Sequence, residues 1–581
     1  MGKISGAEIL VRSLKMQGVQ KLFTLPGAEF LPVYDACLRE GIEVIGGRHE
    51  GAVVQTAEGW SRVAGEPAVA AVAVGPGHAN GVAGFATAYA ECSPVIMLSG
   101  TDESGLLGKG ARQELPQVEM CAPLAKWSAL VTEARRIPEA VATAFEMATG
   151  GVPGPVHLSL PADTLEQPVE EDAVTFPPPR WRTPGGGRGT EDGLIEAALD
   201  LLATARRPVL IAGITAFWSQ AGAALQSLVE TTKVPLFTVE RSRGLVPDDH
   251  PYCFGDGSAI VNPAAQMIHY ADMVILLGDK IDCRFGWGQV FGKAKVIQVC
   301  PAPAEIGRNC PVRLGLAGDA RVVTEQLLAA ARQRTWQDRT SWLETLRQAR
   351  REQQARVEEL DSSLETVPHA IHIAGAVEEF LDADSILVFD GGDCSGWARF
   401  RLKARRPGGW QASSVLGHLG CGLPYALGAQ VASPRSRVVL LTGDGAMGFS
   451  VMEFETAVRH RLPVVIVVAN DASWGFEEYV QRNWFGPDRL VATALGNVRW
   501  DEMAKAMGGW GELVERREDL RPALARAFAA GVPACVNVLT RSTPSPLTQS
   551  FLRQFARRRA QIRQAAETLP AAGEPAAQAA P

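Results

Sequence analysis

Residues 437–471 read RVVLLTGDGAMGFSVMEFETAVRHRLPVVIVVAND, with two short apolar runs on either side of a stretch of helical periodicity. The first run ends in Gly443, Asp444 and Gly445, and the second ends at Asp471. This alternation is typical of a βαβ unit in a parallel sheet covered on both faces. Ligands of such sheets bind beyond the carboxyl ends of the strands. If the two strands are neighbours, Asp444 and Asp471 lie at one edge of the sheet.

The same pattern recurs in the first and middle thirds of the chain, where strands such as AVAAVAVG (68–75) and DMVILLG (272–278) precede helical stretches. We therefore expect an α/β protein of three domains, each a mainly parallel sheet flanked by helices. A Pro- and Gly-rich linker and a charged helical linker separate the domains. The predicted parts are domains at 1–165, 191–330 and 368–545, linkers at 166–190 and 331–367, and a tail at 546–581 that is disordered from about residue 562.

Composition excludes several classes of protein. Of the 581 residues, 46% are hydrophobic and 21% are charged, which suits packed cores rather than a disordered chain. The net charge of -7 provides no basic excess for nucleic acid or anionic lipid. No apolar run reaches the roughly 18 residues of a membrane span, and we expect a cytoplasmic location. The ten cysteines form no C-x-x-C pair, so their spacing suggests neither a zinc site nor a disulfide framework.

Two carboxylates at one sheet edge repel each other unless one takes up a proton or a cation lies between them. Oxygen ligands flanked by glycines suit Mg²⁺ shared with a phosphate group. Gly443 and Gly445 let backbone amides approach an anion, and the helix from about Ala446 directs its N-terminus at it. The prediction is a diphosphate bridged by Mg²⁺. In the alternative interpretation, Gly443–Gly445 is an ordinary turn with Asp444 as the helix cap.

The segment 443–471 resembles the thiamine-diphosphate signature, in which GDG is followed after some 25 residues by Asn-Asn or Asn-Asp. The resemblance covers nearly the whole chain and is to the acetolactate synthase group, with the architecture of pyruvate decarboxylase. Ser473-Trp474-Gly475 is similar to benzaldehyde lyase within that group. The resemblance implies that Asp444 and Asp471 bind Mg²⁺ through their side chains and Ser473 through its carbonyl. Asp471 replaces the usual Asn and adds a negative charge.

A second segment, GGRHEGAVVQTAEGWSRVAG (46–65), resembles the family's R-H-E-x-x-A motif and places Glu50 at the position of the catalytic glutamate. There the resemblance implies that the carboxyl group hydrogen-bonds the ring nitrogen of the cofactor's aminopyrimidine. Without the resemblance, Glu50 is a solvated residue at the start of a helix.

The resemblance implies further contacts in both halves of the site. Each has a plainer alternative: a surface acid for Glu29, a loop position for His78, a core residue for Leu419 and a solvated helix acid for Glu477. Benzaldehyde lyase has His at the position of Glu29. The implied cofactor residues are Pro26, Asn80, Gly392, Asp393, Leu419, Trp474, Gly475 and Phe476, and the implied substrate residues are Glu29, His78, Gln113, Phe476 and Glu477.

The middle domain lacks G-x-G-x-x-G, but segments 278–289 and 295–309 lie where some relatives bind FAD or ADP, so a second nucleotide is possible. The function implied is a lyase or carboligase that uses thiamine diphosphate and Mg²⁺ on 2-oxo acids or 2-hydroxy ketones. Family precedent places active sites between subunits, in a homodimer at least and typically a homotetramer. The alternatives are a 2-hydroxyacyl-CoA lyase or oxalyl-CoA decarboxylase, and an inactive scaffold or regulatory relative.

Overall fold

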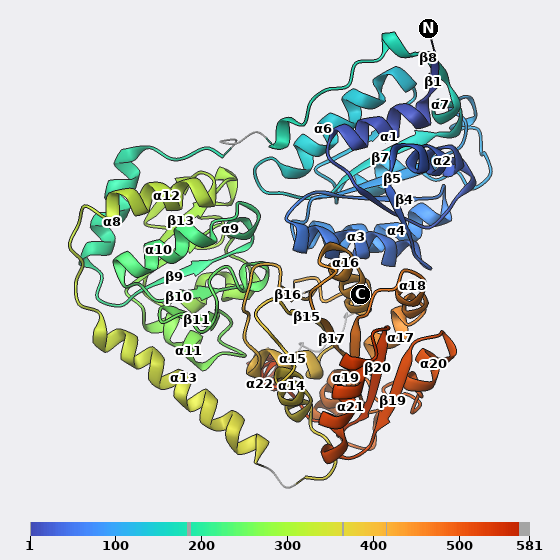
Figure 1. Ribbon diagram of the computed structural model, residues 1–581. Coiled ribbons are helices and arrows are strands. Elements are labelled where there is room, and N and C mark those ends of the chain that lie inside the picture. Colours follow the sequence, from blue (N-terminus) through green and yellow to red (C-terminus); the bar gives the residue numbers. More distant parts are fainter. Residues whose placement is uncertain (1, 183–186, 363–364, 414, 569–581) are drawn as a thin grey trace, which may run out of the picture.

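The computed structural model describes residues 2–182, 187–362, 365–413 and 415–568. Three six-stranded sheets form the centres of three domains, and all of their described strand pairs are parallel. Figure 1 shows the three domains around a common junction, each sheet flanked by helices. The predicted fold class is confirmed.

The first domain is built on strands whose central members, β4 and β5, are buried along their whole length. Such continuous apolar strands need helices on both faces. β8 (Pro168–Glu170) returns from the predicted linker to pair antiparallel with β1 (Lys3–Ser5). The sheet order is β3 (Glu43–Gly46), β2 (Lys21–Thr24), β4 (Ala68–Val72), β5 (Val95–Thr101), β7 (Val156–Pro161) and β6 (Trp127–Leu130). The helices are α1 (Gly6–Met16), α2 (Leu31–Glu40), α3 (Glu50–Ala64), α4 (Pro76–Ala90), α5 (Gln117–Cys121), α6 (Ile137–Thr149) and α7 (Ala162–Glu166).

The central domain repeats this architecture. It leads into a 22-residue helix, α13 (Thr340–Asp361), which places Trp342, Leu343 and Leu346 against the domain core although its surface is highly charged. The sheet order is β11 (Cys253–Asp256), β10 (Leu236–Thr238), β9 (Pro208–Ala212), β12 (Met273–Leu277), β13 (Lys295–Cys300) and β14 (Leu314–Ala317). The helices are α8 (Asp192–Thr204), α9 (Ile214–Trp218), α10 (Gly222–Thr232), α11 (Pro263–Gln266) and α12 (Ala320–Ala331).

In the third domain, the strands that carry the predicted carboxylates, β17 and β18, are adjacent, and Gly443 is in register with Ala469. The sheet order is β16 (Trp410–Gln411), β15 (Ile386–Asp390), β17 (Val438–Gly443), β18 (Val465–Asn470), β20 (Ala534–Leu539) and β19 (Trp510–Val514). The helices are α14 (Ala370–Glu378), α15 (Asp393–Arg401), α16 (Gly422–Ala432), α17 (Asp444–Ser450), α18 (Glu453–Arg459), α19 (Gly475–Phe485), α20 (Trp500–Ala506), α21 (Arg517–Ala529) and α22 (Pro546–Thr568).

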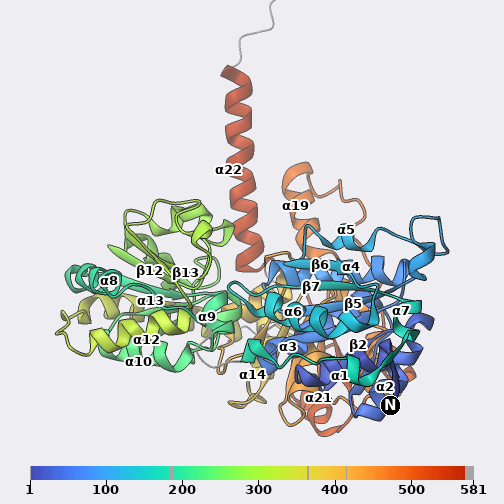
Figure 2. The same ribbon diagram turned by 90° about the horizontal axis from the view of Figure 1, so that it is seen from above.

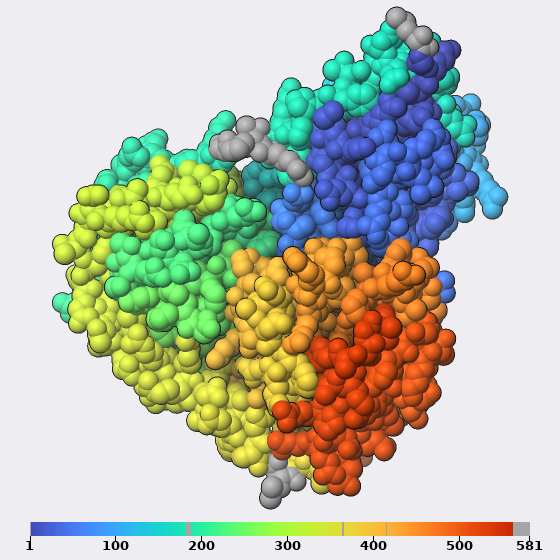
Figure 3. Space-filling view, viewed as in Figure 1, coloured from blue at the N-terminus to red at the C-terminus, as the bar shows by residue number. Residues whose placement is uncertain are grey.

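Helix α3 of the first domain packs directly on α16 of the third, and both helices carry glycine at the contact. A Cβ atom on Gly428 would lie 2.0 Å from the Thr56 carbonyl oxygen, so only glycine permits this approach. The Glu453 carboxylate accepts hydrogen bonds from the backbone of Arg48 and His49, each at 3.0 Å. Figure 3 shows the third domain in contact with both other domains on this face.

Helix α22 projects from the molecule as a rod (Figure 2). It runs to Thr568, beyond residue 562, from which we predicted disorder; residues 569–581 lie outside the described part. None of the helices in the described ranges is long and apolar enough to cross a membrane.

Candidate active site

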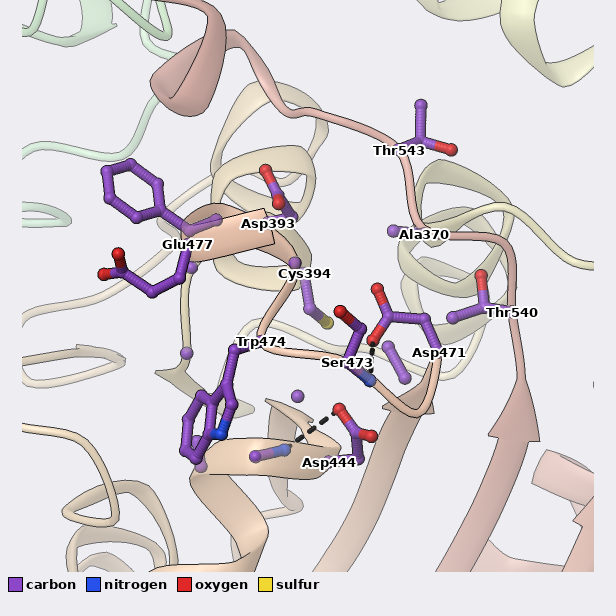
Figure 4. A pocket seen from close by; sticks show the side chains of 18 of the residues that line it. Ala370, Asp393, Cys394, Asp444, Asp471, Ser473, Trp474, Glu477, Thr540 and Thr543 are labelled. Atoms are coloured by element: carbon purple, nitrogen blue, oxygen red, sulfur yellow. Dashed lines mark hydrogen bonds between the residues drawn. The ribbon is translucent and has the colours of Figure 1, made fainter. Parts of the chain in front are cut away.

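The carboxyl edge of the third sheet holds a cavity of about 310 Å³. Figure 4 shows Asp444, Asp471 and Ser473 close together within it, and Trp474 and Glu477 farther along the wall. All of the predicted third-domain residues line it: Gly392, Asp393, Leu419, Gly443, Asp444, Gly445, Ala446, Asp471, Ser473, Trp474, Gly475, Phe476 and Glu477.

Asp444 begins helix α17 and is 4% exposed. Its Oδ1 accepts a hydrogen bond from the Gly445 backbone N–H at 2.9 Å, whereas its buried Oδ2 has no partner. Burial, and then the neighbouring carboxylate of Asp471, raises the pKa of Asp444 to about 7. A buried carboxylate oxygen without a partner is costly unless a proton or a cation satisfies it.

Asp471 follows β18, and the loop after it is held by backbone contacts. Its Oδ1 accepts from the Ser473 N–H at 3.3 Å, and the Trp474 N–H donates to the Thr493 carbonyl at 2.8 Å. Burial raises the pKa of Asp471 as well, and the nearby Asp393 carboxylate adds to the shift. The Trp474 ring covers Gly445, where a Cβ atom would lie 2.5 Å from it. Gly445 is therefore required for this wall of the cavity.

Asp393 lies near Asp471: both carboxylates face Gly475, and one oxygen of each would lie within 3.5 Å of a Cβ atom at that position. Its Oδ1 accepts from the Ser545 backbone N–H at 2.7 Å and from the Thr548 hydroxyl at 2.6 Å, while Oδ2 is buried without a partner. Asp393 thus fastens the start of α22 at the rim of the cavity.

This donor set fits a divalent cation. Asp444, Asp471 and Asp393 are hard oxygen ligands in a partly dehydrated cavity, and two of them present unpartnered oxygens. Burial, and then the like charges of neighbouring carboxylates, raise the pKa values of Asp444 and Asp471. A cation would compensate these charges, so the residues fit a metal-bound diphosphate better than a bare one.

Sequence reasoning missed part of the lining. Thr540, Arg541 and Thr543 follow β20, so the rule that ligands bind at carboxyl ends of strands was sufficient to find them. Gly391 and Cys394 follow β15, and Ala469 lies near the end of β18, so the same rule covers them. It does not cover the remaining two, Ala370 and Gly417.

The first-domain residues form a separate group. Glu50 begins α3, is 9% exposed, and accepts a hydrogen bond from the Asn80 side chain at 3.1 Å. A Cβ atom on Gly77 would lie 3.2 Å from the Glu50 carboxylate, and one on Gly100 would lie 2.9 Å from Glu29 Cβ. Pro26, Asn80 and Gln113 are exposed on the same domain. None of the predicted first-domain residues lines the cavity of its own chain: Pro26, Glu29, Glu50, His78, Asn80 and Gln113.

His78 differs from the pocket residue that we expected. It is completely buried, and its Nδ1 lies 2.8 Å from the Ser99 hydroxyl inside the first domain. Its side chain therefore faces the core of the domain rather than a substrate.

The two segments predicted for a second nucleotide behave differently. In 278–289, Arg284 pairs with Asp279 at 2.6 Å and with Asp282 at 2.9 Å, so these charges are engaged with one another. In 295–309, Pro301 and Pro303 line a cleft of about 1310 Å³ between the first and central domains. The family matches below give no support for FAD, and ADP in this cleft remains a prediction.

Comparison with known families accounts for this arrangement. Three models of thiamine pyrophosphate enzymes match in order: the N-terminal TPP binding domain over residues 4–120, the central domain over 195–327 and the C-terminal TPP binding domain over 390–538. The chain belongs to the thiamine pyrophosphate enzyme family.

Within this family the chain groups with the acetolactate synthases. It is 36% identical to the acetolactate synthase large subunit IlvG of Mycobacterium tuberculosis over 92% of this chain and 95% of that protein. It is 30% identical to a probable acetolactate synthase large subunit of Methanocaldococcus jannaschii over 92% of each chain. It is also 30% identical to human 2-hydroxyacyl-CoA lyase 2, over 88% of this chain and 86% of that protein. The chain is therefore a thiamine-pyrophosphate-dependent enzyme of the lyase and carboligase type.

Proposed function

We propose that this protein is a Mg²⁺-dependent carboligase or lyase of the acetolactate synthase type, acting on 2-oxo acids or 2-hydroxy ketones in the cytoplasm. The observation that carries the proposal is the unpartnered Oδ2 of Asp444, buried in a cavity that Asp471 also lines. A closer likeness to benzaldehyde lyase rests on Ser473-Trp474-Gly475 and remains a prediction.

In this proposal, Asp444 and Asp471 hold Mg²⁺ through their carboxylates and Ser473 holds it through its carbonyl. Gly443 and Gly445 let backbone N–H groups face the diphosphate, and the α17 N-terminus favours its negative charge. Leu419 and Phe476 are apolar walls that limit access of water to the reacting end of the cavity. When bound, thiamine diphosphate supplies the electron sink for making or breaking a bond next to a carbonyl group.

Glu50 has the role of holding the ring nitrogen of the aminopyrimidine, and we propose that it does so in the cavity of a second copy of the chain. The cavity of one chain is lined by third-domain residues. On the first domain, Asn80 bonds Glu50 and is exposed, as are Pro26 and Gln113. Two copies related by a twofold axis would join each first-domain group to the partner's cavity. A homotetramer would be a pair of such dimers.

Mixing two inactive variants tests this assembly. Glu50→Gln and Asp444→Asn are each expected to abolish carboligation of pyruvate and cleavage of benzoin or acyloins. If the variants are unfolded and refolded together at equal concentration, half of the dimers are mixed and each keeps one intact site, so about a quarter of the activity should return. Activity that does not return, in mixtures shown to exchange subunits, contradicts a shared site. Proton exchange at C2 of bound cofactor no faster than in free cofactor would indicate an inactive relative.

A second candidate is a 2-hydroxyacyl-CoA lyase or oxalyl-CoA decarboxylase, favoured by the likeness to human 2-hydroxyacyl-CoA lyase 2. Arg541 lines the cavity, and Arg553, Arg557 and Arg559 extend along α22, whose Phe551 packs on Phe476. Guanidinium groups on a helix that packs at the cavity rim suit the phosphates of CoA. Turnover that requires CoA thioesters and fails with free acids would select this candidate.

A further inference from the structure

A cluster of nitrogen and sulfur side chains is buried in the first domain, apart from the cavity. His78 comes from α4, Cys121 ends α5, and His157 lies on β7. All three are 0% exposed, and one ligand atom of each lies within 4.8 Å of the others. The three residues come from segments far apart in the sequence, so no spacing motif predicts the cluster.

The hydrogen bonds around His157 determine its tautomer. The Ser128 hydroxyl donates to the Val118 carbonyl at 3.0 Å, so its oxygen accepts from Nδ1–H of His157 at 2.9 Å. Nδ1 therefore carries the proton and Nε2 carries the lone pair. The Ser99 hydroxyl, 3.0 Å from Nε2, is then the donor of that contact.

The same argument continues to His78. Because the Ser99 hydroxyl gives its only proton to His157, its oxygen accepts from Nδ1–H of His78 at 2.8 Å. The lone pair of His78 is consequently on Nε2, which lies 3.8 Å from Cys121 Sγ. The His78 lone pair faces the Cys121 thiol, the His157 lone pair accepts from the Ser99 hydroxyl, and each imidazole donates its other N–H to a serine. Metal-binding histidines are typically held by such partners.

We propose that His78, Cys121 and His157 bind one Zn²⁺ through Nε2, Sγ and Nε2, with a water molecule as the fourth ligand. The Ser99 hydroxyl then turns away from His157 Nε2 and still accepts from His78 Nδ1–H. Zinc takes nitrogen and thiolate ligands at about 2.0–2.3 Å in a tetrahedron, so the three ligand atoms must move closer together and the hydrogen bond from Ser99 to His157 must open when the metal binds. On binding, the Cys121 S–H bond breaks, its proton goes to solvent, and the thiolate forms the metal bond.

Ionisation of the three groups is consistent with this chemistry. Burial lowers the pKa of His78 to about 4 and that of His157 to about 3, so both imidazoles are neutral at neutral pH, as metal ligands must be. Burial raises the pKa of Cys121 to about 12, so its thiol stays protonated until a metal replaces the proton. His78 lies in the first turns of α4 with Asn80, which bonds Glu50. The metal would therefore fix the turn that positions the catalytic glutamate.

Cobalt titration of the full-length protein tests the site. After dialysis against a chelator, one equivalent of Co²⁺ is expected to produce a sulfur-to-cobalt charge-transfer band, and elemental analysis of the untreated protein should find one zinc per chain. The third-domain cavity has carboxylate ligands and one thiol, Cys394, so the titration is done in an Asp444→Asn, Cys394→Ser background that removes its contribution. Cys121→Ser and His157→Asn should lose the band, whereas Cys37→Ser, which removes another buried cysteine of the same domain, should keep it.

A separate variant tests the assignment of Nε2 as the metal ligand of His157. Ser128→Ala removes the partner of His157 Nδ1 and should weaken cobalt binding about 10- to 100-fold. Unchanged affinity would overturn the assigned ligand atoms. The wild-type measurement does not depend on any variant folding. Circular dichroism and thiamine diphosphate binding first show that the wild-type protein is folded and its cofactor site is intact. If this protein then gives no cobalt band and contains no zinc, the proposal is wrong.

Discussion

Two groups of buried carboxylates in this molecule have opposite surroundings. At the junction of the domains, each oxygen of Glu58 accepts two hydrogen bonds, from Arg62 and Ser93 on one side and from Thr87 and Tyr425 on the other. In the cavity, Asp444 keeps one buried oxygen without a partner. The Glu58 carboxylate is thus satisfied within the chain, whereas the Asp444 carboxylate has an oxygen left for a ligand.

The junction joins all three domains through these charges. Arg62 of the first domain bonds the Tyr425 hydroxyl of the third at 3.0 Å, and Arg241 of the central domain bonds Glu91 of the first at 2.8 Å. A network of this kind fixes the relative positions of the domains. It thereby holds the first-domain group around Glu50 and the third-domain cavity of the same chain at a fixed distance from each other.

The largest effect is expected at the junction. Arg62→Met leaves Glu58 buried without its charged partner and should lower the free energy of unfolding by about 3–5 kcal/mol, measured by urea denaturation. The matched control is Arg136→Met, which breaks an exposed pair with Glu139 and should cost less than about 1 kcal/mol. An equal loss of unfolding free energy in the two variants would contradict the distinction between the buried and the exposed ion pair.

In the cofactor-free protein, the buried Asp444 carboxyl group should make folding stability depend on pH. Asp444 has its pKa raised from 3.8 to about 7, so between these values the folded chain binds more protons than the unfolded chain. Stability therefore falls as the pH rises across this range, by up to about 4 kcal/mol at about 1.36 kcal/mol per unit. Denaturation midpoints measured from pH 4 to pH 8 should decline in the wild type and stay flatter in Asp444→Asn. Parallel curves for the two proteins would contradict the assignment to Asp444.

Removal of the Asp444 charge should abolish function without harming the fold. Asp444→Asn is expected to lower turnover at least about 100-fold, or about 2.7 kcal/mol, because the cation loses a carboxylate ligand. The control is Asp501→Asn in the same domain, whose carboxylate is bonded by Arg499 and Asn537 and does not line the cavity. It should lose stability rather than turnover per folded molecule. Turnover equal to wild type in Asp444→Asn would remove the proposed metal site.

The cavity carboxylates could be predicted from the sequence, whereas the junction network could not. Asp444 and Asp471 follow consecutive strand-like runs, and the rule for carboxyl ends of parallel strands brings them together once β17 and β18 are neighbours. Local pattern was sufficient for the three parallel sheets and for the pair Asp444 and Asp471, whereas lining residues such as Leu419 and Phe476 were found through the family resemblance.

Features that depend on pairing between distant segments were not predictable. Asp393 contacts Ser545 and Thr548, about 150 positions away. His78 of α4 is linked to His157 of β7 through Ser99 of β5, the strand next to β7. Hydrophobic periodicity reports which face of an element is buried but not which element covers it. The same limit applies to Glu58 and Arg241, whose buried environment depends on three domains meeting.

The smallest effect is expected at Asp471, where Asn is the usual residue of the family. Asp471→Asn keeps an oxygen ligand in place but removes one of the charges that raise the pKa of Asp444, so that pKa should fall towards its ordinary value. The Mg²⁺ concentration needed for half-maximal cofactor binding should change by less than about tenfold, since an amide oxygen is also a magnesium ligand. The cofactor-free variant should be more stable than the wild type at pH 8, because less like charge is confined in the cavity. Loss of turnover as complete as in Asp444→Asn would show that the second carboxylate is itself indispensable to the metal.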